Sequence, residues 1–159
     1  MLGAEEFDLV TAVVRRDIGE VRRAREAGVD LADITAPGGT LTGWAAEWGS
    51  TEILAYLLAQ GIPAEPRALS RAADKGHTET VRLLLDHGVN PDLPAEWPPL
   101  CAAAYSGSPG CVRALLRAGA RVDVRMGPQA GGSGGKTPRE LAELRPAEGT
   151  AEILRLLER

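Results

Sequence analysis

The small and apolar residues of this chain recur in one fixed register. In four segments an alanine is followed sixteen residues later by a glycine, and a small-residue stretch, a short turn and an apolar stretch lie between them. Apolar positions at this spacing predict two helices per segment. The alanines are Ala12, Ala45, Ala72 and Ala103, and the glycines are Gly28, Gly61, Gly88 and Gly119. A helix–turn–helix unit repeated about every 30 residues predicts an all-α solenoid, an architecture that presents an extended surface.

The segment from Thr40 to Gly61 shows how one unit is built. Thr40 is a candidate N-cap, since its hydroxyl can accept a hydrogen bond from an unpaired backbone N–H. Gly49 is expected to end the first helix because glycine tolerates a left-handed backbone. Glu52 suits the positive end of the second helix. The buried stripe of that helix is expected to be Ile53, Leu54, Leu57 and Leu58.

The two end units depart from this pattern as terminal caps do. In the first, Arg16 replaces the turn glycine, and Ala24 and Arg25 replace the paired leucines. The fifth unit starts at Thr137 and stops after its last leucines. We therefore expect a single domain over 1–159, with an N-terminal cap at 5–39, repeats at 40–66, 67–97 and 98–136, and a C-terminal cap at 137–159.

The connections between units vary more than the helices. The six-residue link from Gly61 to Arg67 is too short for a projecting hairpin. The eighteen-residue link after Gly119 contains a glycine-rich stretch at 127–135, which we expect to be flexible.

Composition narrows the functional classes. With 22 acidic and 18 basic residues the net charge is −4, which argues against non-specific nucleic-acid binding. No apolar run is long enough to span a membrane, and the acidic start at Met1–Glu6 does not look like a secretory signal. Two cysteines do not make a disulfide framework. We expect a cytoplasmic monomer.

The residues at 98–104, Pro-Pro-Leu-Cys-Ala-Ala-Ala, together with Thr137-Pro138 and Gly76-His77, resemble the ankyrin repeat signature T-P-L-H-x-A-A-x-x-G-H. The resemblance covers nearly the whole chain. The signature His is replaced in every unit, so its hydrogen bonds between neighbouring repeats are expected to be missing and the stacking to be less regular. The replacing residues are Val10, Gly43, Ser70, Cys101 and Glu140.

The resemblance implies a non-catalytic protein-binding module or scaffold, whose first helices line a concave face. Its exposed, variable pair in each unit corresponds to Val14-Arg15, Glu47-Trp48, Asp74-Lys75 and Tyr105-Ser106. Trp48 is the preferred anchor, because Trp is enriched at interfaces, and Trp44 shares its helical face. Packing within the free protein is the alternative for both, and loop packing for Trp97. The candidate partner-binding residues are Trp44, Glu47, Trp48, Arg71, Asp74, Lys75, Tyr105 and Ser106.

Other functions have weaker support. An inhibitor or immunity-type protein could use Glu47 and Asp74 against the basic cleft of one enzyme. The segment 130–137 fits a relaxed phosphate-loop pattern in which Lys136 and Thr137 would contact a nucleotide. No catalytic constellation, cofactor site or metal-ligand spacing is apparent: His77 and His87 lack a nearby Cys, and Cys111 takes a core position.

Overall fold

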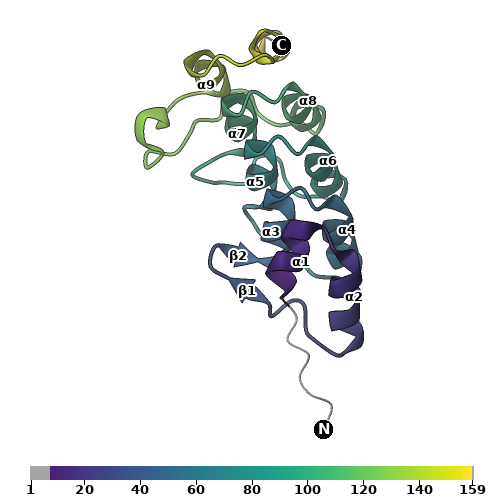
Figure 1. Ribbon diagram of the computed structural model, residues 1–159. Coiled ribbons are helices and arrows are strands. Elements are labelled where there is room, and N and C mark those ends of the chain that lie inside the picture. The colour runs from purple at the N-terminus through teal and green to yellow at the C-terminus, as the bar shows by residue number, and fades with distance from the viewer. Residues whose placement is uncertain (1–7, 159) are drawn as a thin grey trace.

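The computed structural model describes residues 8–158 and arranges them in two stacked rows of helices (Figure 1). The acidic start at Met1–Glu6 lies outside the described residues. The predicted all-α solenoid is confirmed, with two helices in each of the five predicted units. The inner row consists of α1 (Leu9–Arg15), α3 (Leu41–Glu47), α5 (Ala68–Asp74), α7 (Pro99–Tyr105) and α9 (Pro138–Leu144). The outer row consists of α2 (Ile18–Glu26), α4 (Thr51–Ala59), α6 (Thr78–Asp86), α8 (Pro109–Arg117) and α10 (Thr150–Leu157).

Local sequence explains where the inner helices begin. Thr40 caps α3, because its hydroxyl oxygen accepts a hydrogen bond from the backbone N–H of Gly43 at 3.3 Å. Thr137 and Glu140 form a capping box at the start of α9, in which each side chain accepts from the backbone N–H of the other residue. Both threonines therefore convert unpaired backbone donors into hydrogen bonds at a helix start.

The turn between the paired helices requires a left-handed backbone. Gly49 adopts a φ of 62° there. In the first unit Arg16 takes the same conformation, with a φ of 60°, and it is the one non-glycine residue with a positive φ among residues 8–158. The degenerate first unit thus keeps the turn geometry, although an L-residue with a Cβ is strained in this region.

The core lies between the rows and between stacked units. The four alanines that define the repeat frame are fully buried, and their small side chains let successive inner helices approach closely. On α4, Ile53, Leu54 and Leu57 are buried as predicted, and Leu58 is half-buried at the edge of the stripe.

The connections differ in form. The first carries a two-stranded antiparallel hairpin, β1 (Thr35–Ala36) and β2 (Gly39–Thr40), whereas the six-residue link after Gly61 carries no strand, as predicted. The long link contains the short 3-10 helix η1 (Gly131–Ser133) and is closed by two backbone hydrogen bonds of 2.9 Å, from Met126 N to Lys136 O and from Gly135 N to Met126 O. The segment expected to be a flexible linker therefore has a defined, hydrogen-bonded form. Within residues 8–158, no helix has the length and apolarity needed to cross a bilayer.

Candidate functional site

Exposed apolar side chains gather at the carboxyl ends of the inner helices. Among the residues that the structure describes, four large hydrophobic side chains are exposed, and three of them stand at these ends: Val14 on α1, Trp48 after α3 and Leu144 on α9. Val14 and Trp48 belong to neighbouring inner helices, whereas Leu144 belongs to the last one and α5 and α7 carry no exposed large hydrophobic residue. Val14 and Trp48 are members of the variable pairs predicted from the repeat frame, and Leu144 was not predicted.

The two indoles on α3 differ in exposure. Trp48 is the C-cap residue and its side chain is 44% exposed, while its carbonyl oxygen accepts a hydrogen bond from Arg16 Nη2 at 3.3 Å. Trp44 is half-buried near Gly38 at the hairpin tip, and its indole N–H is buried without a hydrogen-bond partner. The free indole face therefore belongs to Trp48, and Trp44 mainly packs the hairpin onto α3.

Arg71 on α5 is the centre of an ionic cluster. Its Nη1 lies 2.8 Å from Glu47 Oε2 and its Nη2 lies 3.3 Å from Glu65 Oε1, and the guanidinium also donates to the carbonyl oxygen of Gly38. Only 16% of the Arg71 side chain and 10% of the Glu65 side chain are exposed. Glu65 also accepts hydrogen bonds from the backbone N–H and the hydroxyl of Thr40. The cluster thus joins α3, α5 and the first hairpin, and it gives both Glu47 and Arg71 an ionic partner.

Glu65 was not singled out from the sequence. Its carboxylate occupies the space beside Gly43, where a Cβ would collide with it. A Cβ at Gly39 would collide with the same carboxylate, so the missing side chains at positions 39 and 43 are the sequence signal for this contact.

The remaining predicted residues lie further along the same edge. Asp74 and Lys75 form an ion pair at 3.3 Å. The ring of Tyr105 packs edge-on against Trp97, with the centroids 5.7 Å apart, and the guanidinium of Arg145 lies 4.8 Å from the Tyr105 centroid. Tyr105 is therefore half-buried between two neighbours rather than free, and Trp97 forms part of the surface.

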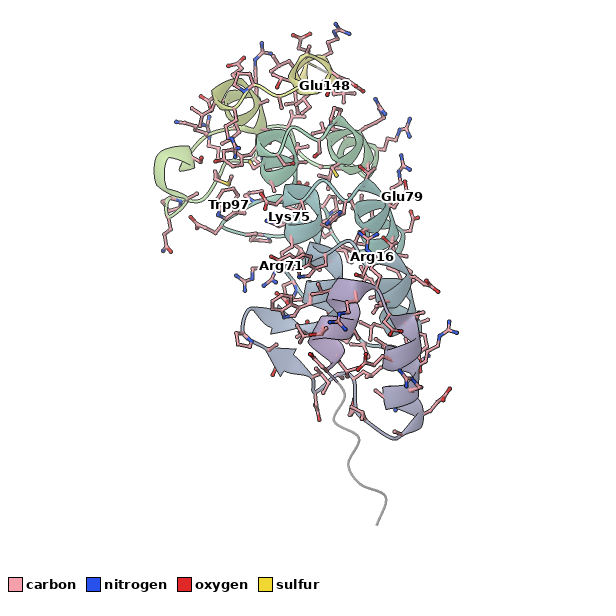
Figure 2. All side chains as sticks on the ribbon, viewed as in Figure 1. Arg16, Arg71, Lys75, Glu79, Trp97 and Glu148 are labelled. Atoms are coloured by element: carbon pink, nitrogen blue, oxygen red, sulfur yellow. The ribbon has the colours of Figure 1, made fainter. Side chains whose placement is uncertain are left out.

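A groove opens between α5 and the following connection. It encloses about 410 Å³, within the range of binding pockets. One wall comes from the exposed face of α5, where Arg67, Ser70, Arg71 and Asp74 follow helical spacing. The opposite wall is the loop Leu93–Trp97, and Pro66 of the short link closes one side. Figure 2 shows Arg71, Lys75 and Trp97 on the side of the solenoid from which the connecting loops project. The groove contains two of the predicted partner-binding residues, Arg71 and Asp74, and adds eight others, among them Arg67, Ser70 and Trp97.

The glycine-rich segment lacks the surroundings of a phosphate loop. No parallel sheet precedes it within residues 8–158. The start of α9, where a phosphate would bind, already holds the carboxylate of Glu140, which accepts hydrogen bonds from Thr137 N at 2.7 Å and Thr137 Oγ1 at 2.9 Å. The geometry gives the nucleotide hypothesis no support.

The two cysteines are buried, and burial keeps their thiols protonated. Burial raises the pKa of Cys101 to about 12 and also raises the pKa of Cys111, so both thiols are protonated at neutral pH. In the described part of the chain, no three His, Cys, Asp or Glu side chains gather as metal ligands would.

Comparison with known proteins identifies this architecture. The family model described as ankyrin repeats, in three copies, matches residues 42–126, more than half of the chain. The chain belongs to the ankyrin repeat family. It is also similar to the E3 ubiquitin-protein ligase hecd-1 of Caenorhabditis elegans, with 36% identity over 98 residues, which cover 57% of this chain. The aligned part is only 4% of the length of that protein, so the similarity concerns one segment of a much larger chain. Ankyrin repeats are generally protein–protein interaction modules and are typically non-catalytic.

In this ankyrin domain the turn residues supply hydrogen bonds between neighbouring repeats. Ser50 Oγ donates to Val13 O at 2.6 Å, and Ser106 Oγ donates to Ala73 O at 3.0 Å. His77 Nε2 lies 3.0 Å from Glu47 O across the next junction. The repeats therefore remain hydrogen-bonded to one another although the His of the ankyrin signature is absent, and Ser106 is engaged in this role.

Proposed function

We propose that this ankyrin domain binds a partner protein through the edge formed by the carboxyl ends of its inner helices and through the adjoining groove along α5. The observation that carries the proposal is the exposed indole of Trp48, with Val14 exposed on the neighbouring inner helix, in a domain that also has a 410 Å³ groove along α5. The general role of ankyrin repeats as interaction modules supports it.

The candidate residues have different roles in this proposal. Trp48 is the anchor, because its exposed indole can bury a large apolar area against a partner. Asp74 and Lys75 offer exchangeable charges beside it. Glu47 and Arg71 are paired with each other, so they support the binding surface and do not offer free charges to a partner. Tyr105 acts with Trp97, whereas Trp44 and Ser106 hold the surface in shape.

An inhibitor acting through acidic residues has no separate support in the geometry. Glu47 is held by Arg71 in the ionic cluster, and Asp74 and Lys75 place opposite charges side by side, so this edge offers no surplus of negative charge to a basic cleft. We therefore propose the broader interaction role, with the domain acting as a monomer.

The test compares two variants that place a new charge on an exposed apolar residue. Trp48→Glu changes the proposed edge, and Val122→Glu changes an exposed site that is not on an inner helix. Each protein is immobilised in an equal amount, partners are captured from host lysate and identified by mass spectrometry, and binding to the purified partner is then titrated. We expect Trp48→Glu to weaken binding more than about tenfold, a typical loss for an interface Trp, and Val122→Glu to leave it unchanged. Equal binding by both variants would remove the Trp48 edge from the interface.

A further inference from the structure

The groove along α5 has opposite charges at its two ends. Arg67 stands immediately before the first residue of α5, and Asp74 is its last residue. At 1.5 Å per helical residue, the two positions are about 10 Å apart along the helix. Arg71, which lies between them, is paired with Glu47 and Glu65. Along α5 the groove is therefore positive at Arg67 and negative at Asp74, and between them two carboxylates surround the Arg71 guanidinium. The opposite wall carries the carboxylate of Glu96, which accepts a hydrogen bond from the backbone N–H of Gln129.

Both end charges are available to a ligand. The Arg67 side chain is 69% exposed, and its one ionic contact is Nε to Glu65 Oε1 at 3.7 Å, to a carboxylate that Arg71 already pairs. Asp74 is paired with Lys75, but Lys75 is the adjacent residue and is itself exposed. Exposed ion pairs of this kind contribute little to stability, so a partner's charges can replace them.

The middle of the groove combines apolar walls with one hydroxyl. Pro66, Leu93, Pro94 and Trp97 supply apolar lining. Ser70 lines the floor and is only 7% exposed, its hydroxyl is not fully buried, and no group among residues 8–158 forms a hydrogen bond with it. A ligand backbone that supplies an N–H or a carbonyl oxygen there adds a hydrogen bond to this hydroxyl.

We propose that the groove binds a polyproline II segment of the partner protein that carries one acidic and one basic side chain three positions apart. A polyproline II helix has three residues per turn and a rise of about 3.1 Å, so residues i and i+3 lie on one edge about 9 Å apart. That spacing matches the distance between Arg67 and Asp74. The acidic residue pairs with Arg67, the basic residue pairs with Asp74, and the intervening prolines pack against Trp97 and Pro94, as proline-rich segments do on aromatic-lined grooves.

This inference rests on the proposed function, since it names the chemistry of the segment that a partner would insert. A charge-swap experiment tests it with four fluorescein-labelled peptides whose central sequences are Glu-Pro-Pro-Arg, Glu-Pro-Pro-Glu, Arg-Pro-Pro-Arg and Gln-Pro-Pro-Gln. Binding to the whole chain is measured by fluorescence anisotropy at low ionic strength. We expect the mixed-charge peptide to bind about tenfold more tightly than the neutral one, as two partly exposed ion pairs provide, and more tightly than either like-charged peptide.

Variants of the chain then change the preference in a defined way. Asp74→Lys should make Glu-Pro-Pro-Glu the best ligand, and Arg67→Glu should make Arg-Pro-Pro-Arg the best ligand. Ser70→Ala should weaken all four peptides by a similar factor without changing their order. Arg117→Glu, on the exposed surface of α8, is the matched control and should leave the order unchanged. Circular dichroism establishes that each variant is folded.

The outcomes separate the two proposals. If the peptides bind without the charge order, or if the two charge reversals do not exchange it, the polyproline II inference is wrong. If no peptide binds while Trp48-dependent capture of a partner persists, the inference also fails and the proposed function stands. If capture is independent of Trp48 while the charge order holds, the groove alone accounts for recognition.

Discussion

Replacing Arg71 with methionine removes the guanidinium that joins α3, α5 and the first hairpin while keeping much of its aliphatic packing. The variant removes the closer cation of the Glu65 carboxylate, which is 10% exposed, and leaves it with Arg67 Nε at 3.7 Å. Breaking a fully buried ion pair costs about 3–5 kcal/mol. Glu65 keeps its hydrogen bonds from Thr40, so we expect a smaller loss, about 2 kcal/mol in the free energy of unfolding. For a chain of this size that corresponds to a decrease in Tm of about 4–8 °C.

The assay is urea unfolding followed by circular dichroism, with Arg71→Met, Glu65→Gln and the double variant compared in a double-mutant cycle. We expect a coupling energy of at least about 1 kcal/mol, because the second substitution removes the charge that the first leaves unpaired. Arg82→Met is the control: Arg82 pairs with Glu79 on the exposed surface of α6, and its loss should cost less than about 0.5 kcal/mol. Additive effects of the two cluster variants, within about 0.5 kcal/mol, would refute the buried-pair reasoning.

Three further predictions follow from single residues. Arg16→Gly should raise the free energy of unfolding by about 0.5–1 kcal/mol, because glycine relieves the strain of a φ of 60°; a loss of stability in thermal unfolding would contradict this. The pKa of Cys101 is raised from 9.0 to about 12, so its folded-state proton stabilises the protein below pH 9 and this contribution is lost as pH rises from 9 to 12. The decrease in Tm between pH 8 and pH 10.5 should therefore be smaller in Cys101→Ala, and equal decreases would count against the buried thiol. Thr137→Ala should cost about 1 kcal/mol through loss of the N-cap of α9, measured by urea unfolding, whereas Thr137→Ser should retain most of it.

The features that the sequence predicted well are those encoded by nearby residues. Ala45, Gly49 and Thr40 each act through the backbone within one turn, so their spacing revealed the helices, the turn and the cap. The ends of the inner helices followed from the same frame, and so did the exposure of Trp48.

The features that escaped prediction depend on contacts between distant parts of the chain. Glu65 is distant in sequence from Glu47 and Gly38, the other partners of Arg71. Its carboxylate fills the space left by the missing side chain at Gly43, and the repeat pattern does not predict this contact. The groove depends on the path of the loop that carries Trp97. The defined form of the 126–136 segment comes from backbone hydrogen bonds, and its glycine content does not predict these bonds.

The length of the link from Gly61 to Arg67 can change access to the groove without changing how the helices pack. In Figure 1 the β1–β2 hairpin and the later loops extend from the inner row, whereas this link turns directly into α5. Pro66, at its end, borders the groove. Lengthening the link by a few residues would cover the groove while every helix kept its neighbours, since loop insertions change folding free energy little. A change in the length of this loop alone would therefore change which ligands the groove accepts.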